Sequence, residues 1–267
     1  MANPEHLERL KTADWNGWRQ THPGTTPDLT DTKLEGLDLS GRNLAGADLS
    51  RTKIEGCKLD GASLVRATVH GMMVKATTFD RADLSECDFE YQKLEEMSFV
   101  GAVLRKVSFK SASIKGSNFT ACDMTGAKLE GAIVGAATFT FGRLLYANFR
   151  GVDLDGSTFE GCDLQQAIFD GVTFRRGNVD KANLTLAFFR DAKLAGTTFR
   201  GVKAQRASFR GSDLTSADFT KADLSESDFE RAVFTGANFT ETNMRKFTAH
   251  RADARAATFL HASFDET

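Results

Sequence analysis

The chain of 267 residues is 41% hydrophobic, and its 34 basic and 36 acidic side chains leave a formal net charge of −2. This near-balance argues against a nucleic-acid-binding protein, which needs a basic surface stripe. No apolar run approaches the ~18 residues of a membrane span, and the start of the chain lacks the apolar core of a signal peptide, so we expect a cytoplasmic protein.

Residues 1–28 differ in pattern from everything that follows them. Asn3 is a favourable helix N-cap and Pro4 suits the first helical position, so we expect a helix that continues to about Arg19. A His-Pro-Gly sequence that begins at His22 then ends the helix.

Both tryptophans of the chain, Trp15 and Trp18, lie in this first segment. The repeats that follow form a domain whose first unit has an open apolar end, and such an end needs a capping segment. We therefore expect residues 1–28 to cap that domain. A helix that binds a partner protein is the alternative.

From Leu29 to Phe264 an apolar residue, which we call the centre of a unit, recurs every five positions without a slip. Neither the 3.6-residue period of a helix nor the two-residue alternation of a strand explains this spacing. A fixed short period of this kind indicates a solenoid.

The residue two positions before each centre is small in most units, which predicts a second, narrow inward row. All four cysteines fall in this row, and we expect them to be buried, reduced thiols. Of the 23 glycines, 18 lie two positions after a centre, which predicts a corner with positive φ. The cysteines are Cys57, Cys87, Cys122 and Cys162.

The units ADLSR, ANFRG and ADFTK, which begin at Ala47, Ala147 and Ala217, resemble the pentapeptide-repeat family with its motif A(D/N)LxG. The resemblance covers about nine-tenths of the chain and implies an all-β solenoid, a right-handed quadrilateral β-helix of about twelve coils over residues 29–267. The WNGWR sequence at Trp15 is also similar to leaders of other bacterial members of the family, which supports the cap and favours a bacterial protein.

With four units per coil, 16 of the 19 central phenylalanines fall in two columns on opposite sides. This arrangement predicts two facing aromatic stacks flanked by aliphatic rows. One column includes Phe89, Phe109, Phe149 and Phe169, and the other includes Phe79, Phe99, Phe119 and Phe159.

The sequence has no pattern that indicates catalysis or metal binding. Its five histidines are scattered, and CxxC, HExxH, P-loop and nucleophile-elbow sequences are absent. We expect the Asp residues that precede many centres to point outward and bond nearby backbone. Because Phe and Leu fill the interior, we expect a protein that is not an enzyme and that uses no cofactor and no metal ion.

The resemblance also implies one function. The best-known activity of the family is protection of type II topoisomerases such as DNA gyrase by members that imitate DNA and confer quinolone resistance. Such a mimic needs a strongly acidic surface. Here no side of the coil is strongly acidic, and charges alternate along the side with Asp223 and Glu226. We therefore expect ion pairs between coils, and the DNA mimic remains the alternative.

Nine apolar residues in the middle third of the chain occupy outward positions. Phe141, Leu145 and Tyr146 lie in one coil, where we expect them around one corner, and Leu186 and Phe188 follow two coils along. Because aromatic anchors dominate protein interfaces, we expect a non-catalytic interaction module that binds an unknown partner protein through these five residues. Apolar residues scattered without function are the alternative. The other four are Val100, Val103, Ile133 and Ile168.

Phe259 and Phe264 are the last aromatic centres, and no later segment of the sequence covers them. An uncovered end of a β-helix exposes unpaired backbone N–H and C=O groups together with apolar core side chains. We expect a homodimer in which two such ends meet, which light scattering would detect as a doubled mass. A sequence taken from a longer chain is the alternative.

Overall fold

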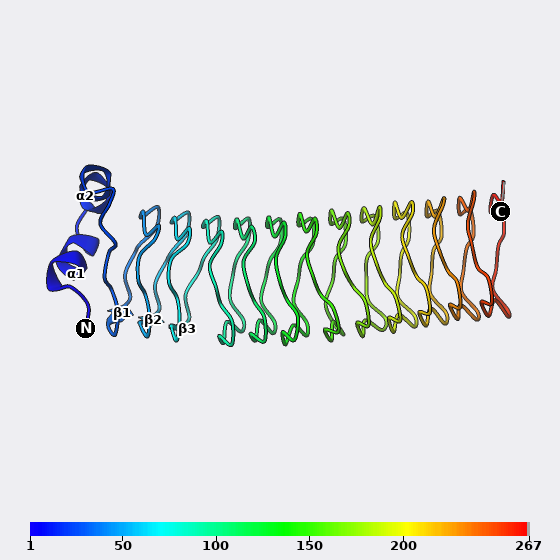
Figure 1. Cartoon of the computed structure of the whole chain (residues 1–267), viewed down its shortest axis with the longest axis horizontal. Coiled ribbons are helices and arrows are strands. Elements are labelled where there is room, and N and C mark those ends of the chain that lie inside the picture. Colours follow the sequence, from blue (N-terminus) through cyan, green and yellow to red (C-terminus); the bar gives the residue numbers. More distant parts are fainter. Residues whose placement is uncertain (266–267) are drawn as a thin grey trace.

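The computed structural model of the chain describes residues 1–265. It is an elongated rod with two short helices at one end, α1 (Pro4–Leu10) and α2 (Trp15–Thr21) (Figure 1). In the described part of the chain, no helix has the length and apolarity needed to cross a membrane. Three parallel strands follow in the spatial order β1-β2-β3: β1 (Lys33–Glu35), β2 (Lys53–Glu55) and β3 (Met73–Lys75).

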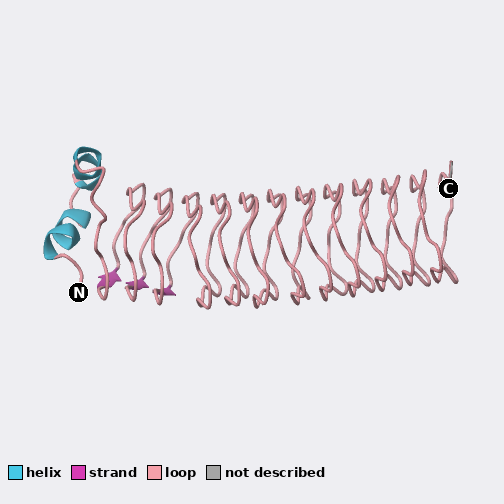
Figure 2. Cartoon of the chain, viewed as in Figure 1, coloured by secondary structure: helices cyan, strands magenta, loops and turns pink. Residues whose placement is uncertain are grey.

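Each coil of the rod pairs with the next at a spacing of twenty residues. In the short sheet Leu34 pairs with Ile54, and isolated parallel bridges such as the one between Asp38 and Lys58 continue the same register along the rod. Bridges occur on every five-residue side, so the coil has four sides. Since most sides contribute only one bridge, Figure 2 draws most of this parallel β-solenoid as loop.

We name the four sides of a coil A to D in chain order. Their centres in one coil are Leu49 (side A), Ile54 (side B), Leu59 (side C) and Leu64 (side D). Adding multiples of twenty gives the same sides in the other coils. Side A therefore lies opposite side C, and side B opposite side D.

Stacked phenylalanine rings fill much of the interior. Phe99 and Phe119 on side C have ring centroids 4.8 Å apart and planes within 1°, and Phe149 and Phe169 on side A are 5.0 Å apart within 3°. The two columns meet edge to face, with Phe149 and Phe159 5.4 Å apart at 89°. The predicted facing stacks are confirmed, and the edge contacts match the charge distribution of aromatic rings.

Cysteine and polar residues of the narrow inward row bond their coil to the preceding one. The Cys162 thiol donates a hydrogen bond to the Phe139 carbonyl at 2.9 Å, and the Ser117 hydroxyl donates to the Leu94 carbonyl at 2.7 Å. All four cysteines are free and buried, as predicted. Burial raises the pKa of Cys162 to about 12, so this thiol stays protonated at neutral pH.

The residue two positions after each centre turns the chain at a corner. The 18 glycines at these corners have positive φ, as predicted, and 29 other residues adopt the same conformation. Gly161 needs to be glycine for a second reason, because a Cβ there would lie 2.5 Å from Cδ1 of Phe141.

The prediction of one helix to about Arg19 is wrong, because α1 ends at Leu10 and a turn precedes α2. In a continuous helix Leu10 and Trp15 would lie about 140° apart around the axis and could not both face one core. The turn between the two helices allows both side chains to be fully buried.

Helix α2 contacts the backbone of the first coil. The Trp15 indole N–H donates to the Asn43 carbonyl at 2.9 Å, and the Arg19 guanidinium donates to the Ala45 carbonyl at 2.8 Å. These bonds supply partners for carbonyl groups that have no preceding coil to pair with.

Phe159 offers a test of the packed interior, since its fully buried ring contacts the rings of Phe139, Phe149, Phe169 and Phe174. We expect Phe159→Ala to lower the free energy of unfolding by about 3–5 kcal/mol, because it removes these contacts and leaves a cavity. Urea denaturation followed by circular dichroism measures the loss. The control Phe141→Ala removes a ring that is 63% exposed and should cost less than ~1 kcal/mol. Equal losses in the two variants would contradict the packed interior.

Candidate binding surfaces

The interior of the rod is closed to ligands. The central side chains are fully buried along nearly its whole length. Residues 1–265 contain no group of three or more His, Cys, Asp or Glu side chains that could hold a metal ion. Sites for a partner or ligand must therefore be sought on the outer surface or between coils.

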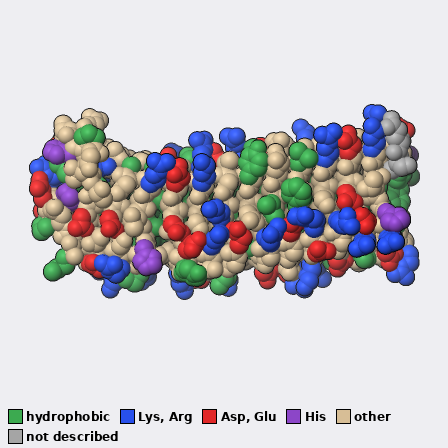
Figure 3. Space-filling model, viewed as in Figure 1, with side chains coloured by type: hydrophobic (Ala, Val, Ile, Leu, Met, Phe, Trp, Pro, Cys, Tyr) green, Lys and Arg blue, Asp and Glu red, His purple; other side chains and the backbone are tan. Residues whose placement is uncertain are grey.

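Arginines of neighbouring coils pair with many of the surface carboxylates. The Asp170 carboxylate contacts the guanidinium groups of both Arg150 and Arg190, and Arg175 pairs with Asp155 at 2.6 Å. Figure 3 shows acidic and basic side chains interspersed along the face in view, without a large area of one sign. The pairing predicted for the side with Asp223 and Glu226 is confirmed, since on this side Arg105 pairs with Asp123 at 2.8 Å and Arg206 pairs with Glu226 at 2.7 Å.

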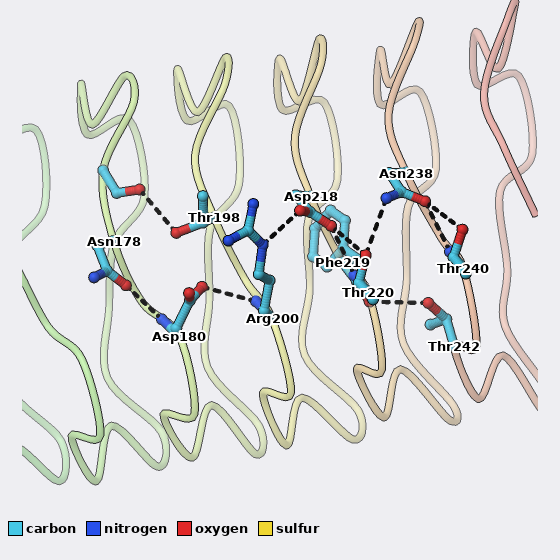
Figure 4. Close-up of polar contacts among 11 residues, drawn as sticks. Asn178, Asp180, Thr198, Arg200, Asp218, Phe219, Thr220, Asn238, Thr240 and Thr242 are labelled. Carbon is cyan, nitrogen blue, oxygen red and sulfur yellow. Dashed lines mark hydrogen bonds and ion pairs between the residues drawn. The ribbon is translucent and has the colours of Figure 1, made fainter.

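Polar side chains also form a connected row along side C (Figure 4). Nε of Arg200 donates to Asp218 at 2.6 Å, while the backbone N–H of Arg200 donates to Asp180 at 2.9 Å. Asp218 also accepts the backbone N–H of Thr220, and Nδ2 of Asn238 donates to the Thr220 hydroxyl at 3.0 Å. The outward Asp residues therefore bond nearby backbone, as predicted, and help to join the coils.

Two opposing effects act on Asp170. Burial alone would raise the pKa of its carboxyl, but the hydrogen bonds and charge of Arg190, together with a hydrogen bond from Arg150, outweigh burial and hold the pKa below its ordinary value. A lowered pKa contributes stability above the unfolded value of about 3.9, and this contribution is lost as the pH falls through the folded value.

We expect Asp170→Asn to lower the free energy of unfolding by about 1–2 kcal/mol at pH 7, because it removes charge-assisted hydrogen bonds. The difference from wild type should shrink as the pH falls below about 4, the unfolded value, and through the lower pKa of the folded carboxyl. Denaturation midpoints at pH 7, 5 and 3 measure it. Asp191→Asn, at an exposed corner, is the control and should change little. A loss in Asp170→Asn that does not depend on pH would contradict the assignment.

The five residues predicted to bind a partner do not all lie together. Phe141 and Tyr146 both have positive φ and occupy successive corners, at the two ends of side D. The expectation that they surround one corner is wrong, because a corner recurs every five residues. Leu145 is half-buried on the side between them, and the Phe141 ring lies against Gly161.

Three of these five residues lie close together with Ile168, where sides D and A meet. Tyr146 and Leu186 occupy the corner two coils apart, and Ile168 pairs with Phe188 on side A. We call these four residues the apolar corner. Tyr146 is 53% exposed, and Leu186 and Phe188 are each 37% exposed. Figure 3 shows hydrophobic side chains gathered over the middle coils.

Polar groups border the apolar corner. Gln166 occupies the same corner position in the coil between Tyr146 and Leu186, and its Nε2 donates to the Tyr146 hydroxyl at 3.4 Å. The Arg190 guanidinium lies 5.2 Å from the centroid of the Phe188 ring. Aromatic side chains within a polar rim are typical of protein interfaces.

At the far end of the rod, Phe259 is half-buried and Phe264 is 44% exposed. Their ring centroids lie 5.6 Å apart. The homodimer through these two residues stays a prediction.

Two of the four ladders are interrupted directly after β3. Thr68 and Met73 make no bridge to Asp88 and Lys93, whereas within residues 1–265 all other successive coils are bridged on every side. Figure 1 shows the ribbon opening more widely here than between the neighbouring coils. The rod is therefore split on sides A and B at this one place.

A cleft of about 890 Å³ occupies this opening. Its lips are residues 70–76 and 90–97, and a smaller hollow of about 440 Å³ continues it along side A, between residues 66–70 and 86–91. The cleft is lined by apolar and charged side chains, which include Met72, Met73, Val74, Lys93, Glu96 and Met97.

Large residues in the narrow row explain the opening. Met72 and Gln92 occupy this row in successive coils of side B, where the coils on either side have Thr52 and Ala112, and Met97 occupies it on side C. Two long side chains cannot stack at the ~4.8 Å strand spacing in a row shaped for small ones. We did not predict this cleft, although Met72 and Gln92 are its signal in the sequence.

The register, the four-sided coil and the filled interior define a parallel β-solenoid built from five-residue repeats. The family models described as pentapeptide repeats and pentapeptide repeat region match most of the chain. The chain belongs to the pentapeptide-repeat family. The matched residues are 28–71, 92–169, 174–211, 192–231, 212–248 and 232–267.

Solved structures similar to this chain include HetL, a pentapeptide repeat protein involved in heterocyst differentiation regulation from the cyanobacterium Nostoc sp. strain PCC 7120. The match has 22% identity and a TM-score of 0.51, and covers 92% of this chain and 93% of HetL. Full-length QnrB1, a plasmid-mediated fluoroquinolone resistance protein, matches with 16% identity, a TM-score of 0.28, and coverage of 88% and 92%. These likenesses concern the fold alone. No curated protein matches the chain.

Proposed function

We propose that this protein is a non-catalytic rod that binds a partner protein through the apolar corner. One observation carries the proposal: Tyr146, Leu186 and Phe188 expose apolar surface together, on a rod whose surface otherwise carries interspersed acidic and basic side chains. Anchors of this kind, surrounded by polar groups, contribute most of the binding energy at protein interfaces. The closed interior supports a role without catalysis.

The finer architecture is part of the proposal. Residues 29–267 form a right-handed quadrilateral β-helix of about twelve coils, as the twenty-residue register and the strand spacing support. Residues 1–28 cap its first coil, which the bond from Trp15 to Asn43 supports. A rigid rod presents its anchors with little loss of conformational entropy on binding. The protein acts in a bacterial cytoplasm.

We expect the double variant Tyr146→Ser, Phe188→Ser to fold normally and to lose at least one partner that wild type retains, because it removes both aromatic anchors. Affinity purification with mass spectrometry compares the two proteins. The control is Ile133→Ser, which removes a 60% exposed apolar side chain from side B. If the double variant keeps every partner of the wild-type protein, the apolar corner is not the binding site.

The alternative function, a DNA mimic that acts on DNA gyrase, needs a continuous acidic surface. Pairs such as Arg206 with Glu226 and Arg200 with Asp218 argue against it. We expect a few-fold molar excess of the protein to leave gyrase supercoiling unchanged, with or without a quinolone. Protection of supercoiling from the quinolone would favour the mimic instead.

A further inference from the structure

The cleft leaves one strand edge without its usual partner. One coil earlier, the N–H groups of Leu49 and Gly56 donate to carbonyls of the following coil at 2.8 and 2.9 Å. The equivalent N–H groups of Val69 and Ala76 donate no hydrogen bond within residues 1–265. The same holds for Gly71, which lies at the corner between them. This lip therefore presents a row of free donors.

The opposite lip presents free groups as well. The N–H groups of Asp88 and Lys93 donate no hydrogen bond within the described chain, and the carbonyls of Asp88, Lys93 and Glu95 accept none. Because the next coil pairs with the outer side of this lip, the free groups face the cleft. Backbone groups spaced along an extended edge are the template onto which another strand adds.

Polar contacts fasten both margins of the cleft. Arg66 pairs with Glu86 at 2.8 Å where side D ends, and the Phe79 N–H donates to the Ser98 carbonyl at 2.9 Å on side C. The coils therefore separate only along sides A and B, which meet at the corner of Gly71 and Tyr91. The Tyr91 side chain is 80% exposed there.

The lining favours a ligand with both apolar and basic character. Three methionines and Val74 line the cleft, and methionine adapts readily to side chains of varied shape. Lys75 and Lys93 are already paired, with Glu55 and Glu95. Glu90 and Glu96 make no ion pair within residues 1–265 and leave an excess of negative charge.

We propose that the cleft binds an extended peptide segment of a partner protein by strand addition. The peptide backbone pairs with the free groups of the lips, an apolar side chain packs among Met72, Met73 and Met97, and a Lys or Arg side chain lies beside Glu90 and Glu96. This site is separate from the apolar corner, and the inference does not rest on that surface.

A displayed library of random ten-residue peptides tests the proposal. Selection uses the full-length protein, and the selected peptides are then measured for binding to the closed variant Met72→Ala, Gln92→Ala, Met97→Ala. Alanine is the usual residue of the narrow row, so this variant should restore the missing ladder bonds. We expect peptides that combine an apolar residue with Lys or Arg, and at least about tenfold weaker binding of the selected peptides to the closed variant.

A second variant keeps the cleft open and tests the charge. Glu90→Lys, Glu96→Lys should weaken binding of the same peptides roughly tenfold and reduce its salt dependence. The control Tyr146→Ser, Phe188→Ser should bind them as wild type does, so failure here is distinct from failure of the apolar corner. Selection that recovers no peptide, or only peptides that bind the closed variant equally well, overturns the proposal. So does a charge variant with unchanged affinity.

Discussion

Hydrogen bonding between residues twenty positions apart sets the distance between coils, and the rest of the rod depends on that distance. A parallel ladder holds neighbouring backbones ~4.8 Å apart. Rings such as Phe199 and Phe219 then stack with centroids 4.6 Å apart, and small residues such as Cys162 reach the carbonyl of the preceding coil. Each inward side chain must therefore fit within the distance between one coil and the next.

This constraint explains why much of the fold could be predicted from the sequence. In a solenoid each residue meets its counterpart in the next coil, so a repeating pattern along the chain is also a pattern in space. The five-residue period therefore predicted the ladders. The columns that contain Phe149 and Phe159 predicted the facing stacks, and the narrow row predicted that the cysteines are buried. The outward Asp residues also recur with the five-residue period, so their bonds to nearby backbone could be predicted.

Features without a period were harder to predict. The turn between α1 and α2 depends on which sides of Leu10 and Trp15 meet the first coil, which helix propensity does not contain. Phe141 and Tyr146 were placed around one corner because they are close in sequence, although five residues separate successive corners. The cleft depends on the summed volume of side chains in neighbouring coils, and no single unit reveals that sum.

The same physical rule accounts for the stable rod and for its one opening. Where small residues occupy the narrow row of side B, the coils close and all four ladders form. Where Met72 and Gln92 follow each other in that row, two ladders are lost and polar backbone groups are exposed beside an apolar lining. The departure from the repeat therefore places free backbone groups and apolar side chains together at one site. The regular coils on either side keep this site rigid.

Residue-resolved amide hydrogen exchange of the free protein tests this account most directly. Amides in closed ladders, such as those of Leu49 and Phe109, should exchange slowly, because they open only with the surrounding coils. Those of Val69 and Val74, which donate no ladder bond, should exchange much faster. Equal protection of Leu49 and Val69 would contradict the account.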